Sequence, residues 1–298
     1  MEAWIILSVA AAAFQTLRFM LQKQLSMGAL SALGATFARF AWSAPFAALL
    51  AGVALGATGA GLPRLSPAFW AHALGGGLAQ ILATWCVVAL FARRNFAVGI
   101  TLKKTEVLQT ALVGFVLLGD RTGPAALAAI AGGLAGVLVL SRGPDSVARQ
   151  GVFNRAAGLG LASGALFAVS AVGYRGATLE VASDLPLLRA VVTLAVVTAA
   201  QAMGMAFWLA WRDRAQLARV AAAARPGLAM GLCSLGGSLC WFTAFTLQNA
   251  ALVFAVGQVE VIFSLAVSAL VFRERTTLRE MSGIALLTAS IVALVLVA

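Results

Sequence analysis

The sequence predicts an all-α integral membrane protein with ten transmembrane helices, arranged as two inverted five-helix repeats. Of the 298 residues, 62% are hydrophobic and only 10% are charged, and the mean hydropathy is +0.98. Soluble domains carry about a quarter charged residues, so the solvent predicted for this chain is lipid. Its apolar stretches are about 20 residues long, which is the length that a helix needs to cross ~30 Å of hydrocarbon.

Short polar joints separate the apolar stretches, and clusters of Gly, Pro and Arg mark them at 56–67, 93–95, 119–124, 141–155 and 212–226. The expected helices span roughly 3–25, 32–56, 68–92, 96–118, 123–141, 156–178, 186–211, 227–247, 250–272 and 279–297. The joint at 141–155 lies near the middle of the chain. We therefore expect a first five-helix repeat over 1–141, a linker loop over 142–155, and a second, inverted five-helix repeat over 156–298.

The repeat is visible when residues 95–122 are laid on residues 249–276 at a constant offset of 154. Without a gap, Glu106 falls on Glu260 and Asp120 falls on Glu274. Each half holds five expected helices, an odd number, so the second half enters the membrane from the opposite side. Such inverted repeats are typical of transporters.

The fourth expected helix is short and ends in Gly-Asp-Arg-Thr at 119–122, and the ninth ends in the similar Arg-Glu-Arg-Thr at 273–276. In this pattern the chain resembles the EamA-type branch of the drug/metabolite transporter superfamily. The resemblance covers nearly the whole chain. It implies ten helices, a central cavity, and secondary transport, frequently export, of small metabolites or drugs. The proline common in helices 4 and 9 of that family is absent, and Glu106 and Glu260 stand at about that place.

These two glutamates lie about ten residues into their helices, which corresponds to a depth of ~15 Å. A charge at the bilayer centre costs roughly 2.5–3.5 kcal/mol, so such groups usually face a cavity or a partner. We expect Glu106 and Glu260 to line a common central cavity, where they bind an ammonium group or exchange protons. In the alternative, each pairs with a nearby cation, such as Lys103 three residues before Glu106, and only fixes helix packing.

Basic, amide and aromatic side chains within the expected helices complete the candidate pocket. Arg18 shares a helix face with Gln15 and Gln22, and Lys103 and Gln109 recur on the face of Glu106. The candidate substrate-binding residues are Glu106, Glu260, Lys103, Lys104, Arg18, Arg39, Gln15, Gln22, Gln80, Trp85, Gln109, Tyr174, Trp241 and Gln258.

The arginines of the joints predict the orientation. Twelve follow odd-numbered helices, whereas the opposite face has little beyond Arg64 and Arg121. By the positive-inside rule, the arginine-rich face is cytoplasmic and both termini are periplasmic, in a multi-pass protein of a bacterial inner membrane. Lys23, Arg175 and Arg189 lie close enough to helix ends to reach the interface.

Together these features predict a transporter and no enzyme. There is no Gly-rich phosphate loop, Ser/His/Asp set or His-Glu-x-x-His motif, and the three cysteines lack metal-ligand spacing, so we expect no cofactor and no metal. The leading hypothesis is a secondary exporter of small zwitterionic or anionic metabolites such as amino acids, a substrate class implied by the resemblance. The alternative is a proton-coupled multidrug antiporter of lipophilic cations that uses Glu106 and Glu260.

The expected partners are a small-molecule substrate, the lipid bilayer and, as a candidate coupling ion, protons. Nucleic-acid binding is not expected despite the net charge of +11, because no soluble domain or basic tail presents these charges to a duplex. We expect the chain to act as a monomer.

Overall fold

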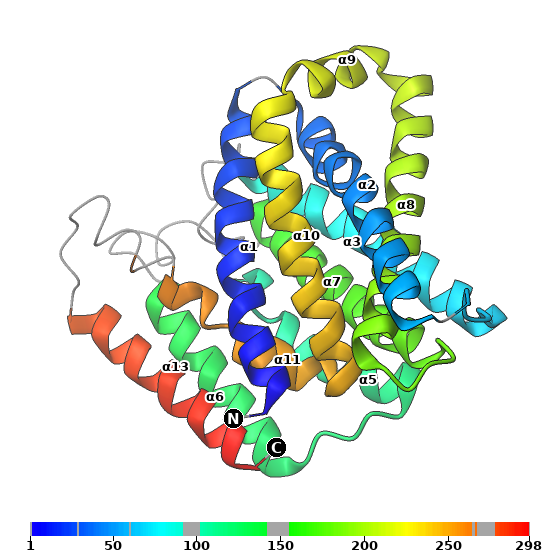
Figure 1. Ribbon diagram of the computed structural model, residues 1–298. Coiled ribbons are helices and arrows are strands. Elements are labelled where there is room, and N and C mark those ends of the chain that lie inside the picture. Colours follow the sequence, from blue (N-terminus) through cyan, green and yellow to red (C-terminus); the bar gives the residue numbers. More distant parts are fainter. Residues whose placement is uncertain are drawn as a thin grey trace.

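The computed structural model describes residues 2–28, 30–59, 61–91, 102–141, 155–263, 266 and 278–297, which form helices joined by turns (Figure 1). The helices are α1 (Ala3–Met27), α2 (Ala32–Thr58), α3 (Pro67–Phe91), α5 (Glu106–Leu118), α6 (Pro124–Ser141), α7 (Arg155–Leu179), α8 (Pro186–Arg212), α9 (Arg214–Ala222), α10 (Ala224–Leu247), α11 (Ala250–Gly257) and α13 (Leu278–Val297). The all-helical class predicted from the sequence is confirmed for these residues, which contain no strand.

Six of these helices, α1, α2, α3, α7, α8 and α10, are long and apolar enough to cross a membrane. Shorter apolar helical stretches cover Glu106–Leu118, Pro124–Val139, Ala250–Phe263 and Met281–Val297. Large apolar side chains also point outward from the bundle, including Phe207 at 78% and Leu296 at 79% exposure. An outer surface of this kind is suited to lipid and is rare in water.

The helices pack in side-by-side pairs: α3 with α7, α1 with α10, α2 with α8, and α6 with α13 (Figure 1). Glycines allow the closest approach. A Cβ atom added to Gly173 of α7 would lie 2.9 Å from the carbonyl oxygen of His72 and 3.0 Å from Cα of Gly76 on α3. Small residues let helix backbones pack closely in lipid, where van der Waals contact replaces the hydrophobic effect between helices.

Two expected helices are interrupted, which corrects the continuous helices predicted at 96–118 and 250–272. Turns at 104–105 and 258–259 separate short helical stretches, and in each case the next helical residue is a glutamate, Glu106 or Glu260. At the second break, the N–H groups of Gln258 and Val259 donate to carbonyls three residues back, a tightening typical of strained helix segments. Residues 96–101 and most of 264–277 lie outside the described residues, as does 142–154 of the expected linker.

The expected polar joint at 212–226 contains a helix, α9, which lies across the end of the bundle between α8 and α10 (Figure 1). Its sequence is rich in alanine and arginine, which are strong helix formers. Gln216 and Val220, four residues apart, form its buried face. The side-chain oxygen of Gln216 accepts from the backbone N–H of Ser31, so α9 is docked on the start of α2.

Arg175 near the end of α7 holds three helix ends together. Its Nε donates to Oδ2 of Asp120 at 2.8 Å, and its Nη1 donates to the carbonyls of Phe245 and Gln248 at 2.8 Å each. Asp120 follows the left-handed Gly119 that ends α5, and the two carbonyls lie at the end of α10. One guanidinium therefore ties α5, α7 and α10, consistent with the favourable placement of cations at helix C-termini.

We expect Arg175→Ala to lower the stability of the folded protein by about 3 kcal/mol, because Asp120 and two helix-end carbonyls lose a largely buried cation. Thermal unfolding of purified protein in detergent measures this change. The matched control is Arg121→Ala, since Arg121 neighbours Asp120 but is exposed. Equal melting temperatures for the two variants would contradict the assigned role of Arg175.

Candidate functional site

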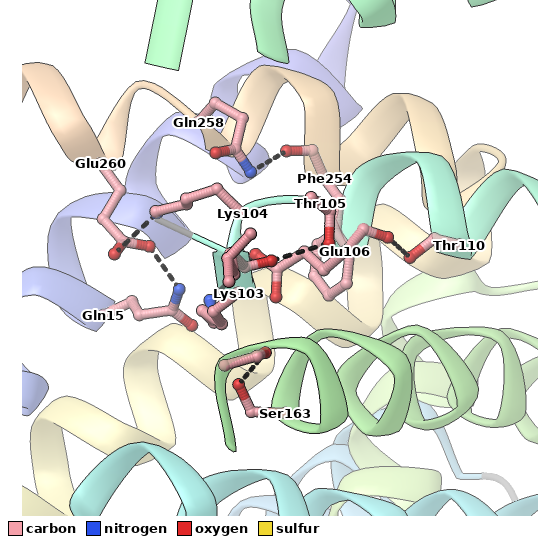
Figure 2. Close-up of polar contacts among 12 residues, drawn as sticks. Gln15, Lys103, Lys104, Thr105, Glu106, Thr110, Ser163, Phe254, Gln258 and Glu260 are labelled. Atoms are coloured by element: carbon pink, nitrogen blue, oxygen red, sulfur yellow. Dashed lines mark hydrogen bonds and ion pairs between the residues drawn. The ribbon is translucent and has the colours of Figure 1, made fainter. Parts of the chain in front are cut away.

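Two lysine–glutamate pairs lie at the two helix breaks (Figure 2). Lys103 Nζ lies 2.9 Å from Oε1 of Glu106, and Lys104 Nζ lies 3.2 Å from Oε1 of Glu260. The second carboxylate also accepts at 2.6 Å from Nε2 of Gln15 on α1. All four charged side chains are at most 14% exposed. The pairing expected in the alternative interpretation is therefore present, and the Lys104–Glu260 pair joins the two halves of the chain.

The interruption of the helix also favours the negative charge of Glu106. Because α5 begins at this residue, its carboxylate lies in the first helical turn, where the unpaired N–H groups carry partial positive charge. Lys103 precedes the turn, and its ammonium group stands over the ring of Phe167 at 4.9 Å from the centroid. The break thus brings a lysine, an aromatic ring and a helix N-terminus to one carboxylate.

Glu106 and Glu260 line one cavity, together with Lys103, Gln15 and Gln258. Aromatic side chains of Phe167, Trp241 and Phe254 complete its wall. The structure therefore brings together the two glutamates that coincide when residues 95–122 are laid on residues 249–276. The space open to the centre of a water molecule is only about 20 Å³, which is room for about one water.

A second cavity adjoins the first and is lined by two arginines. Arg18 is 3% exposed and Arg39 is 4% exposed. Nη1 of Arg18 donates to Oε1 of Gln22 at 3.0 Å. Arg39 donates from Nε to Ser234 at 2.9 Å and from Nη1 to Thr84 at 3.0 Å. Both arginines thus bond to neutral oxygens.

The charges around this arginine cavity do not cancel. Within the described ranges, no carboxylate oxygen lies within 4.0 Å of either guanidinium. Arg18 and Arg39 are near enough for their charges to repel, and the negative charge of Glu260 acts in the opposite direction on Arg18. Glu260 is itself paired with Lys104. Among the described residues of this region, two buried arginines and two buried lysines thus accompany two carboxylates.

Aromatic rings separate the two cavities. Gln15, Phe167, Trp241 and Phe254 line both of them. Trp241 stacks on Phe245 with ring centroids 5.7 Å apart, and the edge of Phe254 meets it at 5.3 Å. The arginine cavity offers about 30 Å³ to water centres, which is room for about two waters and too little for a metabolite.

An amide–phenol network closes the far side of the arginine cavity. The hydroxyl of Tyr174 donates to Oε1 of Gln80 at 2.9 Å, and Nε2 of Gln201 donates to the same oxygen at 3.0 Å. Gln201 also donates to the carbonyl of Gly77 at 2.9 Å. Sequence reasoning singled out Gln80 and Tyr174 but missed Gln201, although a lone amide in an apolar helix is the same kind of signal.

The remaining candidates differ in position. Gln22 is buried and donates to the carbonyl of Ala35, so it orients Arg18 behind the cavity. Gln109 donates to the Thr105 hydroxyl, and the side-chain oxygens of Gln109 and Gln258 are buried with no partner among the described residues. Trp85 is not brought to the site. It is 40% exposed and lines an apolar groove between α3 and α8.

Comparison with known proteins supports the fold alone. No protein-family model matches the chain, and no curated protein matches it. Solved structures do match. One, described only as "Crystal structure of protein", has 18% sequence identity and a TM-score of 0.66 over 97% of this chain and 99% of that chain. The chain therefore shares its overall arrangement of helices with a solved protein along almost the full length of both.

We expect Glu106→Gln to lower the stability by about 3–5 kcal/mol, because it leaves the ammonium group of Lys103 buried without its counter-charge. Thermal unfolding in detergent measures the change. The double variant Lys103→Met/Glu106→Gln removes both charges and should recover most of the loss. Together with the single variants Lys103→Met and Glu106→Gln it completes a double-mutant cycle. Equal stability of Glu106→Gln and wild type would show that the ion pair contributes nothing.

Proposed function

We propose that the chain is a secondary active transporter that moves small zwitterionic or anionic metabolites, such as amino acids, by alternating access around the two adjoining cavities. The observation that carries the proposal is the pair of buried arginines, Arg18 and Arg39, which line a cavity and bond to neutral groups in the described part of the chain. The likeness to EamA-type drug/metabolite transporters, and export as the direction, belong to this proposal.

A buried guanidinium without a counter-anion is costly, and an incoming anion relieves that cost. Arginine is well suited to the task, since its planar fork makes charge-assisted hydrogen bonds to carboxylate or phosphate. A zwitterion would place its carboxylate toward Arg18 and Arg39 and its amine toward Glu260. The aromatic wall between the cavities would cover an apolar side chain of the substrate.

The small size of the cavities supports a cycle with a closed intermediate. Small-molecule pockets usually measure about 300–1,000 Å³, far above the 30 Å³ of the arginine cavity. Substrate entry therefore requires helices to move. Interrupted helices are typical of transporter sites. The turns at 104–105 and 258–259 lie beside the two lysine–glutamate pairs, so a movement of the helices at these turns would change the charged site.

An inverted repeat of ten spans, in a bacterial inner membrane, is part of the proposal. The two turns differ by 154 residues, the offset at which the sequence repeats. In the proposed repeat, α1, α2, α3 and α6 of the first half correspond in order to α7, α8, α10 and α13 of the second. A two-fold axis would then turn the contact of α3 with α7 into a contact of α10 with α1, and both contacts are present. The pairs α2 with α8 and α6 with α13 lie across the axis. The start of α1 and the end of α13 lie at the same end of the molecule, as an even number of crossings demands (Figure 1).

A proteoliposome uptake screen tests the function, using labelled amino acids, organic anions and quaternary ammonium compounds, each with and without a pH gradient. We expect uptake of a zwitterion or an anion. Arg39→Gln should weaken its apparent affinity about ten- to a hundredfold, since a hydrogen bond to a charged group contributes roughly 1.5–3 kcal/mol. The control is Arg64→Gln, because Arg64 is exposed and remote from the cavities in sequence. Uptake of quaternary ammonium compounds alone would establish the cation antiporter instead.

The proposed orientation has its own test. With the arginine-rich joints cytoplasmic, a phosphatase fused to the C-terminus should be active in the periplasm, and a fluorescent protein fused there should stay dark. Arg214 and Arg219 of α9 would then lie on the cytoplasmic face, at the end of the bundle opposite the termini. An inactive phosphatase together with a bright fluorescent fusion would reverse the assignment.

A further inference from the structure

A cavity much larger than those of the charged site lies outside that site. It is a groove of about 690 Å³ between α3 and α8, far larger than the closed cavities within the bundle. Its lining is almost wholly apolar and includes Leu78 and Trp85 of α3 and Met205 and Trp208 of α8. Gly204 leaves it open, since a Cβ atom added there would meet nothing within 4 Å.

The surroundings of the groove indicate what fills it. Both α3 and α8 have the length and hydropathy of membrane spans, and Leu78 on the groove wall is 59% exposed. The lining runs on α3 from Ala73 to Trp85, which corresponds to ~18 Å of helix. One leaflet of a bilayer has about 15 Å of hydrocarbon. The groove therefore matches the length of an acyl chain lying along the protein.

Arg212 lies near one end of the groove, on the face of α8 that lines it. Gly204, Trp208 and Arg212 follow one another at intervals of four residues, so they lie along one stripe of the helix. The ring of Trp208 meets the edge of Trp211 at 5.5 Å between centroids, and Trp211 is 72% exposed. Tryptophans and arginines collect at the level of lipid head groups. Arg212 is exposed at the end of α8, where α9 turns across the bundle.

We propose that this groove binds a bilayer phospholipid with an anionic head group, whose acyl chain lies between α3 and α8 and whose phosphate meets Arg212. The acyl chain of the lipid would contact Gln201, which lines the groove. Gln201 also donates a hydrogen bond to Gln80, a residue in the wall of the arginine cavity. The lipid therefore contacts the residues that separate the bilayer from the arginine cavity. This assignment does not depend on which substrate the central cavities accept.

Tryptophan quenching by brominated lipid tests the proposal, because Trp85 and Trp208 line the groove. The full-length protein is placed in phosphatidylcholine nanodiscs with increasing fractions of dibrominated phosphatidylglycerol or dibrominated phosphatidylcholine. The fluorescence of the double variant Trp85→Phe/Trp208→Phe is subtracted from that of the wild type, which leaves the fluorescence of the two groove tryptophans. We expect saturable quenching by both lipids. Half of the quenching should be reached at an about fivefold lower mole fraction of dibrominated phosphatidylglycerol than of dibrominated phosphatidylcholine, because one arginine contributes about 1 kcal/mol to the binding of an anionic lipid.

Two matched pairs of variants separate chain and head group. Gly204→Leu fills the groove and should abolish saturable quenching, whereas Gly75→Leu, on an open and exposed face of α3, should leave it unchanged. Arg212→Gln should remove the fivefold preference, whereas Arg64→Gln should retain it. Equal quenching by the two lipids in the wild type, or an unchanged preference in Arg212→Gln, would overturn the proposal. Neither outcome alters the interpretation of the uptake screen.

Discussion

The imbalance of buried charge is the constraint on which the rest of this structure depends. Ionised groups inside a bundle that faces lipid are tolerated when they meet a partner or a cavity. Here the two lysines meet the two glutamates, and the two arginines meet neutral oxygens and the rings of Phe19 and Phe40 within the described residues. The pairs stabilise the bundle, and under the proposed function the two arginines would provide the affinity for an anion.

The helix breaks follow from the same constraint. On a continuous helix, Lys104 and Glu106 would point about 200° apart, since each residue turns the helix by about 100°. The turn at 104–105 lets the side chain of Lys104 reach Glu260 at the other break, while Lys103 stays with Glu106 (Figure 2). Tight packing accompanies the second break. A Cβ atom on Gly257 would lie 2.4 Å from the ring of Trp241, so the last residue of α11 must be a glycine to sit against that ring.

The sequence predicted the long helices well because lipid imposes a simple rule on their length and polarity. The expected starts at 32 and 186 agree with the start of α2 at Ala32 and of α8 at Pro186. The breaks escaped prediction because no proline marks them, and because the polar residues at 103–106 and 258–260 were interpreted as the cavity-facing side of continuous helices. Helix α9 escaped because its arginines resemble those of a polar joint.

The candidate site was predictable in its residue types and unpredictable in its pairing. A charge in an apolar segment is visible in the sequence, which singled out Arg39, but its bond to Ser234 joins residues 195 positions apart. The two mid-helix tryptophans illustrate the same limit. Trp241 lines the cavities and Trp85 faces the groove, because the side of a helix that faces the core depends on packing against other helices. Hydropathy alone contains no such information.

The closed cavities have a consequence for the membrane in which the protein resides. An open, water-filled path between two aqueous compartments would carry protons and small ions down their gradients whenever the protein was idle. Between the buried arginines and the charged pairs there is room for only a few waters, and the rings of Trp241 and Phe254 stand between the two spaces. In this state, the described part of the bundle offers ions no wide aqueous passage. If the proposed transport function holds, this state of the described bundle would limit ion leak between turnovers.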